Sequence, residues 1–158
     1  ARPADAAGRR PSYRITPHNA EAEQSLLGAI LTNNKAYEKV GEFLKPEHFY
    51  DPVHRRIYEI CVERIAKNAL ASPVTLKAFM EHDAGLKELG GPAYLARLAG
   101  SAVSSYGARE YARMIREFAL RRELIALGHD ISARAATVAM AASLPAMTIW
   151  LSALMLPR

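Results

Sequence analysis

The amino-acid sequence predicts an all-α fold, in which a compact bundle of about five helices is followed by one long helix. Half of the residues are hydrophobic and 23% are charged, a balance typical of a globular chain with a core. Apolar residues recur three and four positions apart in successive segments, which is the period of a helix face. No segment alternates apolar and polar residues as a half-buried strand does.

We expect four parts along the chain. Residues 1–16 are rich in Pro, Ala and Arg without periodicity, which predicts a flexible basic arm. Residues 17–107 predict a helical globule, and residues 108–134 predict the long helix. Residues 135–158 form an atypical apolar C-terminal segment.

The first helix is expected to begin at Asn19, because asparagine caps helix N-termini. Glu21 and Glu23 follow in the first turn, where the helix dipole favours acidic side chains, and we assign both that role. The apolar face of this helix consists of Leu26, Leu27, Ile30 and Leu31.

Proline marks the limits of three further helices. Pro46 ends a second helix, Ser72 and Pro73 open a fourth, and Pro92 opens a short fifth helix. Glycines between residues 85 and 91 separate the fourth helix from the fifth. The apolar residues of these helices are Tyr37, Val40 and Leu44, then Leu76, Phe79 and Met80, and then Tyr94, Leu95 and Leu98.

The third helix is expected to begin with Asp51 as its cap and Pro52 as its first residue. His48, Asp51 and His54 are candidate metal ligands by type. Positions six apart on a helix point ~240° away from each other, so the two histidines do not converge. We therefore favour a capped helix start with half-buried histidines and no metal site.

Cys61 is the single cysteine, and it lies on the apolar stripe of the third helix, which favours a small core residue over a nucleophile. One cysteine allows no internal disulfide, which favours a cytoplasmic location. The sequence has no G-x-x-x-x-G-K-[ST] phosphate loop and no G-x-S-x-G motif. We therefore expect no catalytic, metal or cofactor site on this chain.

The long helix over residues 108–134 would measure ~40 Å, more than the globule needs to cover its core. Part of it should therefore meet a partner. The residues expected to bind that partner recur three and four positions apart: Tyr111, Ile115, Phe118, Arg122 and Ile125.

The net charge of +5 lies mainly at the two ends of the chain. Residues 1–16 carry four arginines and one aspartate, whereas residues 17–134 carry 16 basic and 15 acidic residues. A small DNA-binding module is an alternative function, which would use the basic arm with Arg113, Arg116, Arg121 and Arg122. The near-neutral folded part favours a salt-bridged solvent face instead.

Residues 135–157 contain no charged residue, and ~20 apolar residues are enough to span a membrane. A membrane-tethered helical protein is therefore a further alternative. Seven alanines, Pro145 near the middle and Trp150 inside the apolar run argue against a membrane anchor. We expect a replaced C-terminus, most simply produced by a frame change, that makes the chain poorly soluble.

Five segments stand in an order that is typical of one family: PHNAEAEQSLLGAIL, FYDPVHRRIYE, VTLKAFMEH, GGPAYLARLA and YARMIREFALRREL. Together they resemble the N-terminal domain of the DnaB family of bacterial replicative DNA helicases. The resemblance covers roughly residues 17–134. Residues 135–158 depart from the family, whose members continue with a polar loop and a second amphipathic arm.

The resemblance implies a non-catalytic collar domain, a helical globule followed by a helical hairpin, whose first arm is residues 108–134. It implies self-association from dimer to hexamer, binding of the primase DnaG and, in some bacteria, of a helicase loader. ATP and magnesium binding and 5′ to 3′ movement on single-stranded DNA belong to the family's motor domain. The Walker motifs of that domain do not occur in this sequence, and a membrane partner is not expected.

Overall fold

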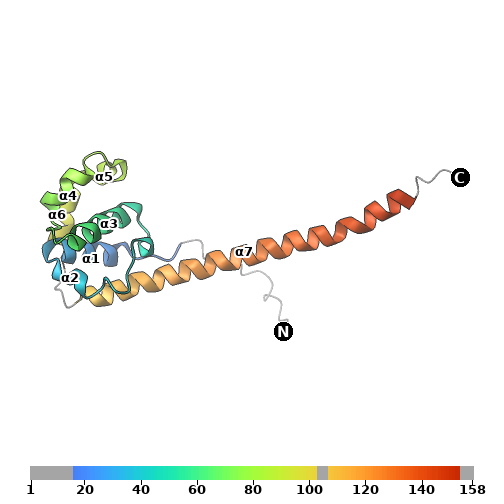
Figure 1. Ribbon diagram of the computed structural model, residues 1–158, viewed down its shortest axis with the longest axis horizontal. Helices are drawn as coiled ribbons and strands as arrows, with labels where there is room; N and C mark the ends of the chain where they lie inside the picture. The colour runs from blue at the N-terminus through green and yellow to red at the C-terminus, as the bar shows by residue number, and fades with distance from the viewer. Residues whose placement is uncertain (1–15, 103–106, 154–158) are drawn as a thin grey trace, which may run out of the picture. The chain divides into compact units, whose positions relative to one another are not determined.

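The computed structural model describes residues 16–102 and 107–153, with side chains through residue 142. Within these ranges the chain forms seven α-helices, one short 3₁₀ helix and no strand, which confirms the predicted all-α fold. The elements are α1 (Ala20–Thr32), α2 (Lys35–Glu38), η1 (Pro46–His48), α3 (Pro52–Ala66), α4 (Pro73–Met80), α5 (Ala84–Glu88), α6 (Pro92–Gly100) and α7 (Ala108–Ala153) (Figure 1). Residues 1–15 of the expected basic arm, which was predicted over residues 1–16, and the last residues, 154–158, lie outside the described part.

The chain divides into two compact units, Ala1–Leu120 and Arg121–Arg158. The first unit contains α1 to α6 and the beginning of α7. Its core forms mainly where α1 packs against α3 and α6. The largest fully buried side chains of this core include Leu26, Ile30, Ile57, Tyr58 and Leu95.

Polar side chains fix the starts of the helices, as expected from the sequence. The side chain of Asn19 accepts a hydrogen bond from the backbone N–H of Ala22 at 2.9 Å. The carboxylate of Asp51 accepts from the N–H of Val53 at 2.7 Å and begins α3. These bonds satisfy backbone donors that have no partner inside the helix.

The close packing of α1 on α6 depends on Gly28. A Cβ atom at this position would lie 2.1 Å from the carbonyl oxygen of Leu98. No side chain larger than hydrogen fits at that distance without moving one of the two helices. Gly28 therefore sets how closely the two central helices approach.

The observed helices differ from the expected ones in three places. The second expected helix is reduced to the four residues of α2, followed by turns. A short additional helix, α5, begins after Asp83, whose side chain accepts from the N–H of Leu86 at 2.8 Å. The long helix does not end at Arg134 but continues to Ala153.

Candidate functional site

The beginning of α7 belongs to the core of the first unit. Ala108, Ala112, Ile115 and Ala119 are at most 3% exposed, and their spacing of four, three and four places them on one side of the helix. Three of these four residues are alanines, which allow a close approach of the helix to its neighbours. One side of α7 is thus already covered within the first unit.

The five residues expected to bind a partner differ in exposure. Ile115 is 2% exposed and packs in the core, so it does not contribute to an exposed surface. Tyr111, Phe118 and Arg122 are half-buried, and Tyr111 packs against the same core. Ile125 is the most accessible of the five, with 45% exposure. Partner binding through these residues stays a prediction, and it cannot involve the side chain of Ile115 in this structure.

A second apolar stripe runs along the part of α7 that belongs to the second unit. It consists of Leu124, Leu127, Ile131 and Val138, and we call it the α7 stripe. These side chains are between 55% and 67% exposed. Leu124, Ile131 and Val138 stand seven residues apart, and Leu127 lies three positions after Leu124. Apolar residues at this spacing form the seam of helices that pack side by side.

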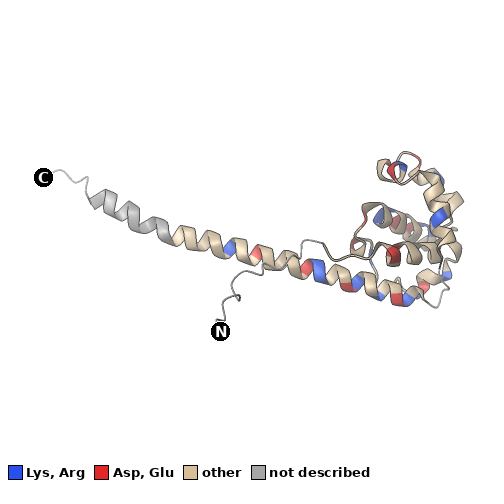
Figure 2. Ribbon diagram, turned by 180° about the vertical axis from the view of Figure 1, so that it is seen from behind, with Lys and Arg blue, Asp and Glu red and all other residues tan. Residues whose placement is uncertain are grey.

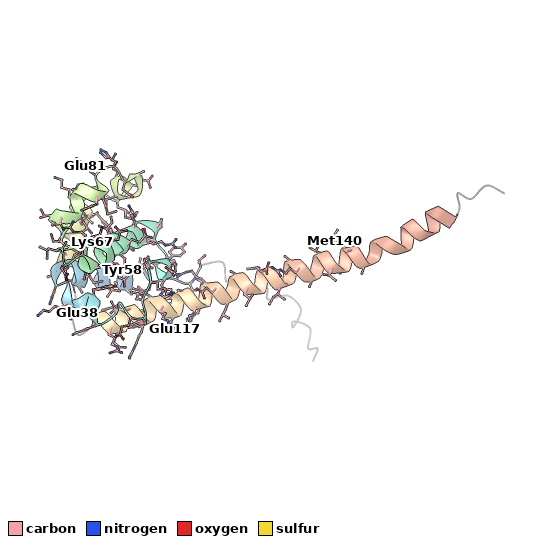
Figure 3. The ribbon with its side chains drawn as sticks, in the orientation of Figure 1. Glu38, Tyr58, Lys67, Glu81, Glu117 and Met140 are labelled. Atoms are coloured by element: carbon pink, nitrogen blue, oxygen red, sulfur yellow. The ribbon has the colours of Figure 1, made fainter. Side chains whose placement is uncertain are left out.

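The α7 stripe and the expected partner residues occupy different sides of the helix. Successive residues of an α-helix are ~100° apart, so Arg122 lies roughly opposite Leu124, Leu127 and Ile131, and Ile125 lies ~100° to ~160° away from them. The seven-residue spacing is visible in the sequence and could have identified the stripe. Met140, 70% exposed, lies further along the same unit (Figure 3).

Charged residues on α7 form the mixed face expected from the sequence. Arg113 pairs with Glu110 at 2.9 Å, and Arg134 pairs with Asp130 at 2.9 Å. Figure 2 shows basic and acidic residues interleaved along the first part of the helix. This pattern is that of a solvated helix surface, and it gives no support to a strip dedicated to phosphates.

A buried polar cluster joins α1, α3 and α6. The Nδ1 atom of His54 donates to the Oε2 atom of Glu23 at 2.7 Å, and its Nε2 atom lies 2.6 Å from the hydroxyl of Tyr94. Glu23 also accepts from the backbone N–H of Tyr50 at 2.7 Å. Burial raises the pKa of Tyr94, and the hydrogen bond from Gln24 opposes that effect.

This cluster extends one assignment made from the sequence and corrects another. Glu23 stands in the first turn of α1, as expected, but its side chain is also buried, 2% exposed, and bonded to other helices. His54 is not half-buried but 1% exposed, and both of its ring nitrogens have partners within the fold. Because every member is engaged with another, the cluster is a structural centre that fixes the three helices.

The remaining candidate residues have structural roles. The Nδ1 atom of His48 accepts from the N–H of Lys45 at 3.1 Å, while Asp51 caps α3. Among the described residues, no group of three His, Cys, Asp or Glu side chains could hold a metal ion. Cys61 is fully buried, and burial raises the pKa of its thiol to about 12. The thiol therefore stays protonated near neutral pH, as expected for a core residue.

No helix in the described part of the chain is both long enough and apolar enough to span a membrane. Side chains from residue 143 onward lie outside the described part. The backbone is helical through Ala153.

Comparison with protein families finds a match to the DnaB-like helicase N terminal domain over residues 15–117. The replicative DNA helicase DnaB of Rickettsia prowazekii (strain Madrid E) is 40% identical over 118 residues, which are 75% of this chain and 24% of that protein. The DnaB of Treponema pallidum (strain Nichols) is 32% identical over 122 residues, covering 77% of this chain and 28% of that protein. The chain thus spans about a quarter of the length of these curated relatives.

Solved structures agree with this match. The crystal structure of the N-terminal domain of DnaB helicase from Mycobacterium tuberculosis superposes with a TM-score of 0.74 and 30% identity, covering 79% of this chain and 89% of that one. The structure of a DnaB-like replicative helicase, described with its interactions with primase, matches with a TM-score of 0.63 and 28% identity. That match covers 73% of this chain and 27% of the helicase.

Proposed function

The chain belongs to the family of DnaB-like helicase N-terminal domains, and from this premise we propose that it assembles the collar of a replicative helicase and binds primase. The chain is thereby connected with DNA replication through its family. In this proposal it performs no reaction of its own. It brings copies of itself together and offers a surface to the enzyme that makes primers.

The α7 stripe is the observation that carries the proposal of self-association. Leu124, Leu127 and Ile131 are each more than half exposed on one side of the helix. Burying such a side chain contributes about 1.5 to 3 kcal/mol. A second copy of α7 offers an equally apolar seam of the same spacing, so that pairing would remove both stripes from water.

Primase binding is supported by a related protein. A DnaB-like replicative helicase that matches 73% of this chain was studied with its interactions with primase. We propose that this chain uses the same kind of partner, the bacterial primase DnaG, and that a helicase loader is a further partner. Ile125 and the half-buried Tyr111, Phe118 and Arg122 remain candidates for such contacts.

The matched relatives are much longer than this chain, because the 118 matched residues are 24% of the Rickettsia prowazekii protein. We propose that a protein carrying this domain together with a motor domain is an ATP-dependent DNA helicase that moves 5′ to 3′. ATP and magnesium would be bound by that motor domain. DNA would be contacted mainly by the same domain, since the charges on α7 are mixed.

The proposal is tested with the purified chain in two measurements. Multi-angle light scattering should give a dimer or a larger assembly at high concentration. Isothermal titration calorimetry with the C-terminal domain of the cognate primase should give a saturable binding isotherm. A monomer at all concentrations together with no heat on adding primase would overturn the proposal.

A further inference from the structure

Helix α4 has apolar residues on two opposite faces. Leu76 and Met80 are at most 1% exposed and face the core, whereas Val74 is 82% exposed and Phe79 is 57% exposed. Ala78 is exposed between them, and the only charged residue of the helix is Lys77. A helix that is apolar on more than one face is usually buried on more than one face.

Exposed apolar side chains of the first unit gather around this helix. Leu70 is 64% exposed and lies in the short segment that leads into α4. We call Leu70, Val74, Ala78 and Phe79 the α4 patch. Groups of exposed apolar residues of this kind mark surfaces that bind other proteins.

Arg64 places an ordered cation at the rim of the α4 patch. Its Nε atom donates to the carbonyl oxygen of Leu70 at 2.7 Å, and its Cζ atom lies 5.2 Å from the centre of the Phe79 ring. No carboxylate within the described residues forms an ion pair with it. Its remaining N–H groups can therefore bind a carboxylate of a partner without further ordering of the side chain.

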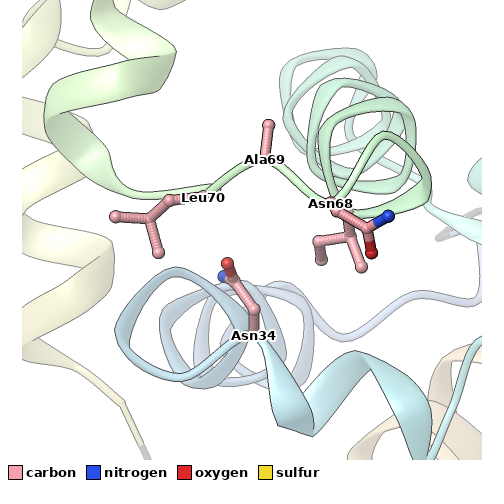
Figure 4. Close-up of a pocket in the computed structure, with 5 residues that line it drawn as sticks. Asn34, Asn68, Ala69 and Leu70 are labelled. Atoms are coloured by element: carbon pink, nitrogen blue, oxygen red, sulfur yellow. The ribbon is translucent and has the colours of Figure 1, made fainter.

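A cavity of about 340 Å³ opens beside the patch and is lined by Asn34, Ile65, Asn68, Ala69 and Leu70 (Figure 4). Asn34 is held in place, because its Nδ2 atom donates to the carbonyl oxygen of Ala71 at 2.7 Å and its Oδ1 atom accepts from the N–H of Ala71 at 3.0 Å. The wall of the cavity is thus fixed before any partner binds. A space of this size can accept an apolar side chain.

We propose that the α4 patch binds an acidic amphipathic helix of another protein. The apolar face of that helix would lie on Val74, Ala78 and Phe79, one of its side chains would enter the cavity beside Leu70, and a carboxylate would pair with Arg64. A helix lying in an apolar groove is a common mode of recognition. This surface involves no residue of the α7 stripe and does not depend on self-association.

The charges favour an acidic partner over a second copy of α4. The sequence of α4, PVTLKAFM, contains a lysine and no acidic residue. The first acidic residue after the helix is its exposed C-cap, Glu81. Two copies of the patch facing each other would bring the Arg64 cations of both copies to one interface. Unlike charges across an interface favour the complex, whereas like charges oppose it.

The test uses the full chain and a synthetic helical peptide with leucines three and four positions apart, flanked by glutamates and labelled with fluorescein. Fluorescence anisotropy should show saturable binding, and a matched peptide with lysines in place of the glutamates should bind roughly tenfold more weakly. Arg64→Gln and Phe79→Ser should each weaken binding of the acidic peptide roughly tenfold. Leu124→Ser, which removes an exposed leucine of α7, should leave it unchanged.

The Val74 side chain is 82% exposed, so Val74→Ser should not disturb folding, and its circular dichroism spectrum should equal that of wild type. The variant should bind the acidic peptide more weakly than wild type. Equal affinity for the acidic and basic peptides would overturn the proposal. So would an absence of binding, or unchanged affinity of the Val74→Ser and Arg64→Gln variants. Sedimentation showing that Val74→Ser dissociates a dimer would assign the patch to a second copy and also overturn it.

Discussion

The two compact units of the chain differ in what covers their apolar residues. In the first unit, Leu26, Ile57 and Leu95 are completely buried by other helices of the same chain. In the second unit, Leu124 and Ile131 are 67% and 58% exposed. Both units use apolar residues at helical spacing. Among the described side chains, those of the first unit cover one another, whereas those of the α7 stripe are exposed.

This difference separates the residues that fold the domain from those available for assembly. A single helix gains little stability in water without tertiary packing. The first unit supplies that packing from α1, α3 and α6. The second unit gains it in our account when another copy of α7 covers the stripe.

Removing His54 should have the largest effect and should be confined to the first unit. His54→Ala removes the hydrogen-bond partner of both the buried Glu23 carboxylate and the Tyr94 hydroxyl, and each buried polar group left without a partner costs about 1 to 3 kcal/mol. Urea unfolding followed by circular dichroism measures this loss. Ile131→Ala serves as the matched change in the second unit and should alter the unfolding of the globule by less than ~0.5 kcal/mol.

The same glycine-to-alanine change should have opposite effects in the two units. Gly28→Ala should destabilise by about 1 to 3 kcal/mol, because its Cβ would lie 2.1 Å from the carbonyl oxygen of Leu98. Gly128→Ala meets no atom within 4 Å and should stabilise α7 by about 1 kcal/mol. Thermal unfolding measures the change in melting temperature, which should be negative for Gly28→Ala and positive for Gly128→Ala. A lower melting temperature for both variants would contradict the expected difference between the two units.

Cys61 should make the first unit sensitive to alkaline pH. Burial raises the pKa of its thiol from 9.0 to about 12, so the unfolded chain releases this proton at lower pH than the folded chain. The contribution to stability is complete below pH 9.0 and is lost as the pH rises towards about 12. In urea unfolding across this window, wild type should lose more stability than Cys61→Ala. Equal losses would show that the thiol is not protected.

The smallest effect is expected for the ion pair between Asp130 and Arg134. Both side chains are more than half exposed, and such a pair four residues apart contributes about 0.3 to 0.5 kcal/mol. Asp130→Asn should lower the helicity of α7 slightly at low salt and have no effect at high salt. A large loss of helicity would indicate that Asp130 has a second role.

The sequence predicted the features of the fold that depend on neighbouring residues. The caps at Asn19 and Asp51 and the core position of Cys61 follow from residue type and local spacing, and the structure confirms them. The burial of Glu23 and its bond to His54 were not predicted, because His54 lies 31 residues away. Spacing along one helix gives no information on such a contact.

Helical spacing also failed to show which side of α7 is available to a partner. Helical spacing identified the face of Tyr111 and Ile115, but it could not tell that this face packs inside the first unit. That outcome depends on Ala112 and Ala119, whose small side chains allow the close approach. The α7 stripe on the other side of the helix has an equally regular spacing and is exposed. Only tertiary contacts distinguish the two faces.

Sedimentation equilibrium of wild type, Ile131→Glu and Ile125→Glu tests most directly whether the α7 stripe drives assembly. Both variants place a carboxylate on exposed positions of the same helix, but on different faces ~120° apart. We expect wild type and Ile125→Glu to self-associate, and Ile131→Glu to associate roughly 100-fold more weakly because a charge would have to enter the seam. A monomeric wild type, or dissociation by Ile125→Glu and not by Ile131→Glu, would contradict the account.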